Sequence, residues 1–394
     1  MIGEQLDEPG TSFIDQFTSA GAARQRCQLT RRGDLSNLDE LRSRLRIVDN
    51  LLETCIALRR PHPASRRSTG HQPAGLTRDG ATRTTVPVVR LVTHAEAMEA
   101  FDYCALIDFM EEQHRHPPAL VDDSYVESPG GDAMLARTGF APGHGLGVKL
   151  AAVFPGNVNR PTVHSTYVLF DPSTGAERAV IAGNALTWFK TACDSALGAR
   201  LLAPDESRVL LMVGAGAMAP HLIRAHRAAR PSIERIEIWN RTRGRACALA
   251  AELADLDALV VDDLPAAVGR ADVISCATMT VEPVIRGAWL RTGTHVDLVG
   301  SFRPDMREAD DELLVAALVH VDSRDTTLVK TGELAIPLAA GTITADDVRG
   351  DLFELVAGDV VGRSSDADIT VFKNGGGGHL DLMAAQFLLG RLRG

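Results

Sequence analysis

The chain has 394 residues, enough for two domains and an additional segment, and an ordinary apolar fraction of 45%. Its formal net charge of −10 disfavours nucleic-acid and membrane-surface partners, whose phosphates attract basic proteins. We find no run of about 18 apolar residues that could cross a bilayer, and the acidic start lacks the apolar core of a secretory signal. Six scattered cysteines without Cys-x-x-Cys spacing predict reduced thiols, no metal site and a cytoplasmic location.

Composition sets residues 1–86 apart from the rest of the chain. The stretches 22–33 and 59–85 are rich in Arg, Ser, Thr, Gly and Pro, which is typical of disorder. Between them, apolar residues from Leu38 to Ile56 recur at helical spacing, but one helix cannot bury its own apolar face. We predict a disordered N-terminal extension with one helix. A transit peptide, which the acidic start opposes, and a start codon placed too far upstream are the alternative explanations.

An ordered α/β domain is expected to begin near residue 87. A strand at 88–92 leads to Thr93, which with Glu96 has the spacing of a helix capping box, so a helix is predicted from there to about His116. Strand-like segments follow at 120–127, 133–136, 166–170 and 179–181, with another starting at Gly147, and a helix is predicted at 185–202.

Two lysines in this domain are unusual. Lys149 lies inside an apolar strand-like run, and Lys190 lies on an otherwise apolar helical face. A buried charge is costly unless it is paired. Either lysine alone could be salt-bridged or could extend its ammonium to solvent, but two of them shortly before a nucleotide-binding pattern indicate an anion site.

The segment 209–219 has the pattern of a dinucleotide-binding turn. Five apolar residues, Val209–Val213, predict a buried parallel strand that runs into a GxGxxA turn and then a helix. Gly214 permits the tight turn, and Gly216 lets the backbone approach a pyrophosphate. Ala217 and Met218 follow at the helix N-terminus, where backbone amides and the helix dipole favour phosphate.

The region 205–325 alternates strands and helices, which predicts a doubly wound parallel sheet. Its expected strands are 209–213, 236–239, 259–261, 273–276, 295–298 and 318–321. After the second strand, Asn240, Arg241 and Thr242 stand where an NAD enzyme usually has an acid. We therefore expect NADPH, with NADH as the alternative, although Arg241 could also be a surface arginine at a helix start. Thr278 and Gly300 are further expected cofactor contacts.

Four successive glycines, Gly375 to Gly378, follow a strand-like segment and precede a predicted helix at 382–389. Such a run is either a mobile loop or a second turn at which the backbone is closely approached.

From about Val88 to its end, the chain resembles the ornithine cyclodeaminase/mu-crystallin family. The shared motifs include Gly147-Val-Lys149-Leu, Phe154-Pro-Gly-Asn157, Leu169-Phe-Asp-Pro-Ser-Thr-Gly175, Trp239-Asn-Arg-Thr242, Arg303-Pro-Asp305, Gly332-Glu-Leu334 and Val371-Phe-Lys373. The resemblance implies a Rossmann NAD(P)-binding domain, 205–325, inserted in a second α/β domain that binds substrate and forms a homodimer. That second domain would comprise 87–204 and 326–394.

Departures from the family pattern narrow the expected chemistry. Phe302 stands where cyclodeaminases carry a catalytic aspartate, and a phenyl ring cannot act as a base. Lys190 replaces the usual arginine, and the run 296–311 resembles the branch that reduces cyclic ketimines. We expect NAD(P)H-dependent reduction of the small imino acids Δ1-pyrroline-2-carboxylate and Δ1-piperideine-2-carboxylate to L-proline and L-pipecolate. The alternatives are an ornithine cyclodeaminase and a mu-crystallin-like protein that binds NADPH and a small ligand.

In the expected mechanism, Lys149 and Lys190 hold the substrate carboxylate, and Phe302 shields the ring from water. A water held by Arg303, Thr187 or Asn157 is one proton source, and binding of the preformed iminium is another. Asp305, Arg307 and Glu308 are interpreted as a structural ion network that caps the next helix.

Overall fold

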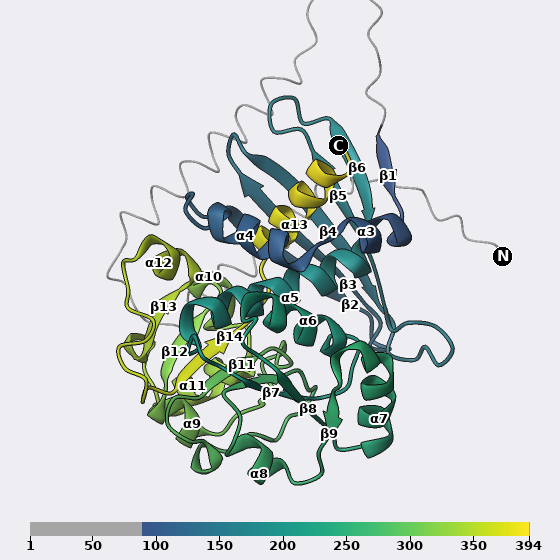
Figure 1. The fold of residues 1–394 in the computed structure, drawn as a ribbon. Helices are drawn as coiled ribbons and strands as arrows, with labels where there is room; N and C mark the ends of the chain where they lie inside the picture. The colour runs from purple at the N-terminus through teal and green to yellow at the C-terminus, as the bar shows by residue number, and fades with distance from the viewer. Residues whose placement is uncertain (1–88, 394) are drawn as a thin grey trace, which may run out of the picture. The chain divides into compact units, whose positions relative to one another are not determined.

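The computed structural model describes residues 89–393, which contain two β-sheets and the helices packed on them (Figure 1). The predicted N-terminal extension, with its helix between Leu38 and Ile56, lies outside the described residues. In the described part of the chain, every helix is too short or too polar to cross a bilayer.

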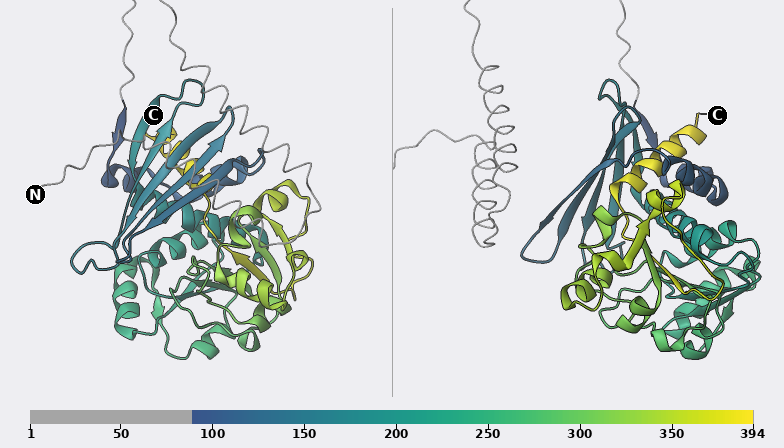
Figure 2. Two further views of the ribbon diagram at one scale, coloured as in Figure 1. Left: turned by 180° about the vertical axis from the view of Figure 1, so that it is seen from behind. Right: turned by 90° about the vertical axis from the view of Figure 1, so that its left-hand side faces the viewer.

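The first sheet has six strands in the order β1-β6-β5-β4-β3-β2. The strands from β2 to β6 pair antiparallel, and β1 pairs parallel with β6. Helices α3, α4, α5 and α13 lie on one face of this sheet (Figures 1 and 2). The bounds are β1 Arg90–Val92, β2 Leu120–Glu127, β3 Ala133–Ala141, β4 Gly145–Val153, β5 Val163–Phe170, β6 Glu177–Ala182, α3 His94–Ala100, α4 Tyr103–Gln113, α5 Gly183–Leu202 and α13 Gly378–Arg391.

The predicted capping box is present, but the helix that follows it is shorter than expected. Thr93 accepts the amide of Glu96, and the Glu96 carboxylate accepts the amide of Thr93. Phe101 and Asp102 are extended, so the predicted helix to His116 is divided into α3 and α4. The Asp102 side chain accepts the amide of Ala105 and caps α4, which explains the break because aspartate favours the N-cap over the helix interior.

The second sheet has eight parallel strands in the order β13-β12-β14-β11-β10-β7-β8-β9. All six strands predicted in 205–325 are present. The bounds are β7 Val209–Val213, β8 Arg235–Trp239, β9 Leu259–Val260, β10 Val273–Cys276, β11 His295–Leu298, β12 Leu318–Val321, β13 Val348–Asp351 and β14 Thr370–Lys373. The helices along this sheet are α6 Ala219–Ala229, α7 Arg243–Glu252, α8 Leu264–Val268, α9 Asp311–Ala316, α10 Arg324–Thr327, α11 Gly332–Ala340 and α12 Leu352–Ala357.

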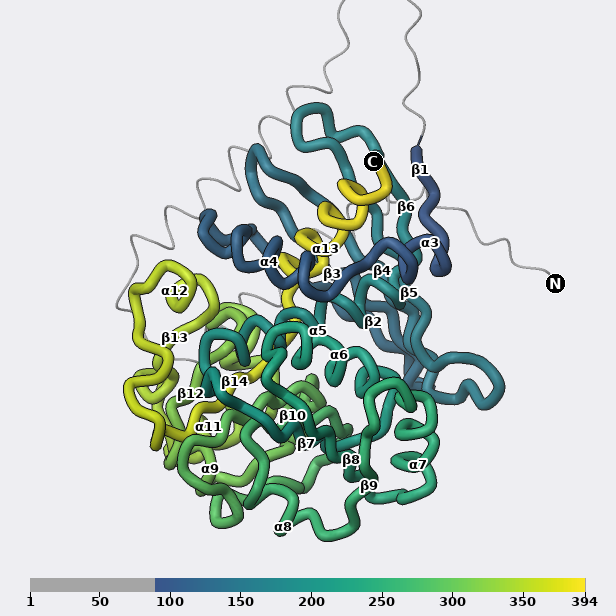
Figure 3. Tube along the Cα trace, viewed as in Figure 1, coloured from purple at the N-terminus to yellow at the C-terminus, as the bar shows by residue number. Residues whose placement is uncertain are grey.

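The tail of the chain is divided between the two sheets. Its strands join the eight-stranded sheet, and its last helix packs on the six-stranded sheet. The sequence placed all of 326–394 with the substrate domain, but β13 and β14 belong to the eight-stranded sheet, and β14 lies between β11 and β12. That part of the expectation is wrong, because strand order is set by pairing across the sheet and leaves no local signal. Figure 3 shows the chain running from β14 into α13, which packs on β3 and β4 of the first sheet.

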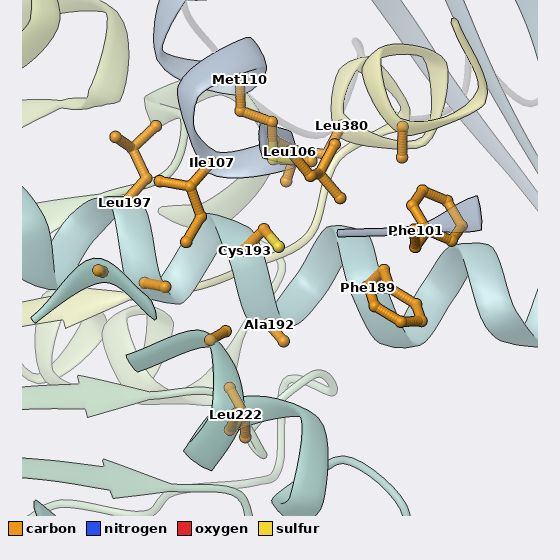
Figure 4. Close-up of a cluster of buried hydrophobic side chains, with 14 of the residues drawn as sticks. Phe101, Leu106, Ile107, Met110, Phe189, Ala192, Cys193, Leu197, Leu222 and Leu380 are labelled. Atoms are coloured by element: carbon orange, nitrogen blue, oxygen red, sulfur yellow. The ribbon is translucent and has the colours of Figure 1, made fainter. Parts of the chain in front are cut away.

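Helix α5 joins the two sheets through one continuous apolar core. It packs against α4 and α13 on one side and α6, β11 and β14 on the other. Figure 4 shows Phe189, Cys193 and Leu197 of α5 among side chains of both layers. A side chain at Gly198 would come within 2.6 Å of the Phe372 ring of β14, so glycine is required where helix and strand approach most closely.

Candidate active site

Lys149 and Lys190 meet around a buried aspartate, Asp381. Lys149 comes from β4, Lys190 from α5 and Asp381 from the first turn of α13. The Lys149 Nζ lies 3.0 Å from Oδ1 and 2.8 Å from Oδ2 of Asp381, and the Lys190 Nζ lies 3.9 Å from Oδ1. The exposures are 5% for Lys149, 2% for Lys190 and 0% for Asp381. Both lysines are therefore salt-bridged to the same carboxylate, and they lie together at one place in the fold.

Arg137 adds a third cation to this cluster. It lies opposite Lys149 in the register of β3 and β4, pairs with Asp123 of β2 and donates to the carbonyl oxygen of Gly376. Lys330 also binds Asp123, at 3.1 Å. In the ion pairs of this cluster, four cations share two carboxylates. The excess of positive charge favours an anionic ligand such as a carboxylate.

Burial and neighbouring charges shift the pKa values of this cluster. Burial lowers the pKa of Lys149 to about 8; Asp381 opposes that shift, and Lys190 adds to it. Burial alone would raise the pKa of Asp381, but Lys149 and Lys190 outweigh it and lower the value. At neutral pH the cluster thus holds an ionised Asp381 and a charged Lys149.

The glycine-rich loop packs directly against the lysines, as the prediction of a closely approached turn required. A side chain at Gly376 would lie 3.0 Å from the Lys190 Nζ. Asp322 accepts the Gly376 amide at 2.6 Å. Asn374 donates to the Thr191 carbonyl and the Ser195 hydroxyl, both at 3.0 Å. These bonds fix the position of the loop in the structure and favour the closely approached turn.

Tyr167 completes the inner wall of the cluster. It lies opposite Lys149 in the register of β4 and β5 and is fully buried. Its hydroxyl has no hydrogen-bond partner among the described residues. A side chain at Gly147 would come within 2.3 Å of that hydroxyl, so the glycine of the Gly147-Val-Lys149 motif makes room for the ring.

The predicted dinucleotide turn has the expected geometry. Gly214 has a φ of +111°, in the range that favours glycine. Gly216 has open space where a side chain would be, and both Gly216 and Ala217 are exposed. Met218 is the residue before α6, which has no side-chain cap. The Ala219 amide donates to the Gly216 carbonyl at 3.0 Å and Pro220 has no amide hydrogen, so a phosphate at this helix start would meet the exposed backbone of Gly216 and Ala217.

The residues after β8 have divided roles. Asn240 braces the turn, because its Oδ1 accepts the Ala215 amide at 3.2 Å and its Nδ2 donates to the Thr242 carbonyl at 2.9 Å. Arg241 and Thr242 are exposed, and Arg241 has no salt bridge within residues 89–393. A cavity of about 720 Å³ beside the turn is lined by Gly216 and Ala217 and by Arg245 of α7.

Glu308 binds both Thr278 and Gly300, the two remaining predicted cofactor residues. Thr278 follows the carboxyl end of β10, and Gly300 follows that of β11. Its carboxylate accepts the amide and hydroxyl of Thr278 at 2.6 and 2.8 Å and the amide of Gly300 at 2.6 Å. Glu333 in turn accepts the amides of Glu308 and Ala309. Burial, and then the charge of Glu308, raise the pKa of Glu333 to about 7. Glu308 is thus structural, but it ties two loops together instead of capping the next helix.

Arg303 does not join the lysine cluster in this structure. It is exposed and forms a surface ion pair with Asp305. Phe302 beside it is 58% exposed. Arg307 pairs with Asp311 at 2.7 Å, in agreement with the structural interpretation of this run.

Three residues of the cluster, Arg137, Tyr167 and Asp381, were not found from the sequence. Arg137 and Tyr167 become neighbours of Lys149 only through strand register. Asp381 comes from a segment 232 positions away from Lys149. The one local signal was an acid in an otherwise apolar helix directly after the glycine run.

A parallel dinucleotide-binding sheet beside a buried cationic site defines an α/β protein of the nucleotide-dependent oxidoreductase class. The model of the ornithine cyclodeaminase/mu-crystallin family matches residues 104–394, and the chain belongs to that family.

Comparison with individual proteins gives more specific similarities than the family model. A Δ1-pyrroline-2-carboxylate reductase from Paracoccus denitrificans is 46% identical over 303 residues, covering 76% of this chain and 96% of the relative. The solved Δ1-pyrroline-2-carboxylate reductase of Thermococcus litoralis, in complex with NADH and L-proline, superposes with a TM-score of 0.73 at 26% identity, covering 77% of this chain and 98% of that one. The iminosuccinate reductase of Paracoccus denitrificans with NAD+ gives a TM-score of 0.71 at 30% identity, with coverage of 77% and 96%.

Proposed function

We propose that this protein is an NAD(P)H-dependent reductase of cyclic ketimines, converting Δ1-pyrroline-2-carboxylate to L-proline and Δ1-piperideine-2-carboxylate to L-pipecolate. The observation that carries the proposal is the cluster of Arg137, Lys149 and Lys190, which has positive charge in excess of its carboxylates. The similarity to two reductases of such imino acids supports the same substrate class.

The chain's own residues bind and orient the substrate. Lys149 and Lys190 hold the carboxylate, and Arg137 stands beside them as a third donor. Fixing the carboxylate fixes the direction of the ring, and such orientation can supply much of the rate. The dinucleotide, when bound at the turn 214–218, supplies the hydride. Asp381 opposes the loss of charge of Lys149 and forms ion pairs with both lysines, and it is a positioning residue.

A reaction screen tests the proposal. NAD(P)H oxidation is followed with five- and six-membered cyclic imino acids, with pyruvate plus ammonia, and with ornithine. We expect turnover with the cyclic imino acids. Ammonia release from ornithine would instead indicate a cyclodeaminase, and tight cofactor binding without turnover would indicate a binding protein. Phe302 argues against the cyclodeaminase because it offers no base.

We infer a preference for NADPH from the residues after β8. No acid stands there to hold a ribose 2′-hydroxyl, and Arg241 is exposed with a free guanidinium within the described chain. Arg245 adds a second cation on the wall of the neighbouring cavity. A guanidinium suits a 2′-phosphate, so we expect NADPH to bind more tightly than NADH.

We also propose that two copies associate through the first sheet. The sheet face opposite its helices carries exposed apolar side chains, and register places Leu120 beside Phe140 and Val126 beside Met134. These four are 66, 41, 67 and 51% exposed. Apolar patches of this kind mark interfaces. Sedimentation should give twice the mass of one chain, and Val126→Glu should give a monomer, whereas Val315→Glu, at an exposed position of α9 outside the first sheet, should not. A monomeric wild-type protein would contradict the proposal.

The cytoplasmic location stays a prediction.

A further inference from the structure

A group of buried polar atoms without partners lies where α5 and α6 cross β11. Asp194, one helical turn after Lys190 on α5, is fully buried, and neither of its carboxylate oxygens has a hydrogen-bond partner among residues 89–393. The same holds for Oδ1 of Asp297, Nδ1 of His226 and Nε2 of His295. Buried polar atoms are usually hydrogen-bonded, so such a concentration requires an explanation.

The other atoms of these side chains form two hydrogen-bonded segments. In the first, the Asp297 Oδ2 accepts from the Ser275 hydroxyl at 2.7 Å and lies 3.1 Å from the His226 Nε2. In the second, the His295 Nδ1 lies 2.9 Å from the Thr370 hydroxyl, which accepts from Arg363 at 3.1 Å. Arg363 lines a surface cavity of about 300 Å³. Asp297 and His295 point to the same face of β11, since they are two residues apart.

Three interruptions separate Lys190 from that cavity. The first lies between the Lys190 ammonium and the Asp194 carboxyl, which stand one helical turn apart without a hydrogen bond or ion pair among the described residues. The second lies between the Asp194 carboxyl and Asp297 Oδ1, and the third between His226 Nδ1 and His295 Nε2. Helix α5, which carries Asp194, packs on β11, which carries Asp297. His226 is bound to Asp297, and His295 lies two residues from Asp297 on the same face of β11. A bridging water at each interruption would satisfy the atoms on both sides.

The protonation states suit proton carriers. Burial, reinforced by the charges of Asp322 and Asp297, raises the pKa of Asp194 well above its usual range, although Lys190 opposes the shift. This shift favours the protonated form of Asp194. Asp322 differs, because it accepts the amides of Ser323 and Gly376. Burial lowers the pKa of His295 well below its usual value, so this imidazole is neutral and can accept a proton on one nitrogen while donating from the other.

We propose that Asp194, Asp297, His226 and His295 form a proton path from the cavity at Arg363 to Lys190, which resupplies the proton consumed when the imine is reduced. The inference rests on the proposed function. Hydride adds to the imine carbon, and the imine nitrogen takes a proton from the Lys190 ammonium. Lys190 takes a proton from Asp194 through one bridging water, and Asp194 is reprotonated through Asp297, His226, His295 and the other two waters by one proton from solvent. One imine, one NAD(P)H and one proton thus give one amine and one NAD(P)+.

Such a path has a physical use at this site. Lys190 is only 2% exposed, and a substrate bound between Arg137 and Lys149 would cover the cluster further. Exclusion of water strengthens the interactions that orient the substrate, but it also cuts the direct supply of protons. A route through the protein interior restores that supply without admitting bulk water.

The test compares Asp194→Asn and Asp297→Asn with the wild type. Both variants should lower kcat by about tenfold or more, leave KM and NAD(P)H affinity within about twofold, and raise the solvent deuterium isotope effect on a single turnover. Asp194→Glu, which keeps an acid, should recover much of the rate. The matched control is Glu237→Gln, a buried carboxylate of β8 that is paired with Arg235 and Arg270 and lies off the path. Its kcat and isotope effect should equal those of the wild type.

The possible outcomes separate this inference from the proposed function. A wild-type protein that reduces no cyclic imine overturns the function. An active wild type whose two Asn variants keep its rate and isotope effect overturns the path alone. If the variants do not fold, the wild type still decides: its single-turnover rate should fall non-linearly as deuterium replaces hydrogen in the solvent, because several protons move. A linear dependence, or none, would overturn the path.

Discussion

Replacement of Asp381 by asparagine should destabilise the protein by removing the only carboxylate that the described structure places on Lys149 and Lys190. Asp381 is fully buried, and its oxygens lie 2.8 and 3.0 Å from the Lys149 Nζ. An asparagine side chain would keep the shape but not the charge. Breaking a buried ion pair by removing one partner costs about 3–5 kcal/mol, because the other charge remains buried without compensation.

The loss should depend on pH in a defined direction. The pKa of Lys149 is about 8 in the folded protein, below the ordinary lysine value of 10.5, and removal of Asp381 lowers it further. A lysine whose folded pKa is depressed destabilises the fold most while it is charged, and this cost fades as the pH rises from the folded pKa towards the unfolded one. Once Lys149 is neutral in both folded proteins, the cost is the same in the wild type and in the variant. The destabilisation by Asp381→Asn should therefore be largest near pH 6 and should shrink as the pH rises through about 8.

Thermal unfolding followed by circular dichroism measures the effect. We expect the midpoint to fall by roughly 5–10 °C at pH 6. The double variant Lys149→Met/Asp381→Leu should regain part of this loss, since only Lys190 then lacks its partner, but it should have no reductase activity. An Asp381→Asn protein that unfolds at the wild-type temperature at pH 6 would refute the ion-paired cluster.

Three further predictions concern the cofactor, the substrate and the packing of the site. Arg241→Asp should reduce the affinity for NADPH about tenfold or more relative to NADH; titration of both cofactors checks this, and an equal loss of both would contradict the 2′-phosphate role. Lys149→Ala should lower kcat/KM about 100-fold, and an unchanged kcat/KM in this variant removes Lys149 from the mechanism. In the wild type, kcat/KM should fall above a pH of about 8 as Lys149 loses its proton. Gly147→Ala should lower the free energy of unfolding, measured in urea, by about 1–3 kcal/mol, because the new methyl group meets the Tyr167 ring. Gly156→Ala, with open space around it, should leave that free energy unchanged. Equal stabilities of the two variants would show that the ring moves freely.

The features that could be predicted locally were predicted well. The apolar run Val209–Val213, the glycines after it and the strand–helix alternation of 205–325 were sufficient for the dinucleotide fold, because hydrophobic periodicity and turn chemistry act within a few residues. The Thr93–Glu96 capping box was recognised for the same reason. Resemblance to the family added the substrate class. It did not reveal that Arg303 lies exposed on an ion pair of its own.

Residue types alone established that Lys149 and Lys190 were costly to bury and therefore had to be paired or functional. The folded chain reveals that they are paired with a common partner, Asp381, which comes from the far end of the chain, and that they face each other in one cluster. The same distinction applies to β14, which inserts between β11 and β12, and to Asp194 and Asp297, which come from a helix and a strand that pack together. Strand order, register and helix crossing bring distant residues together, and no local pattern of residue types encodes which distant side chain will complete a buried charge.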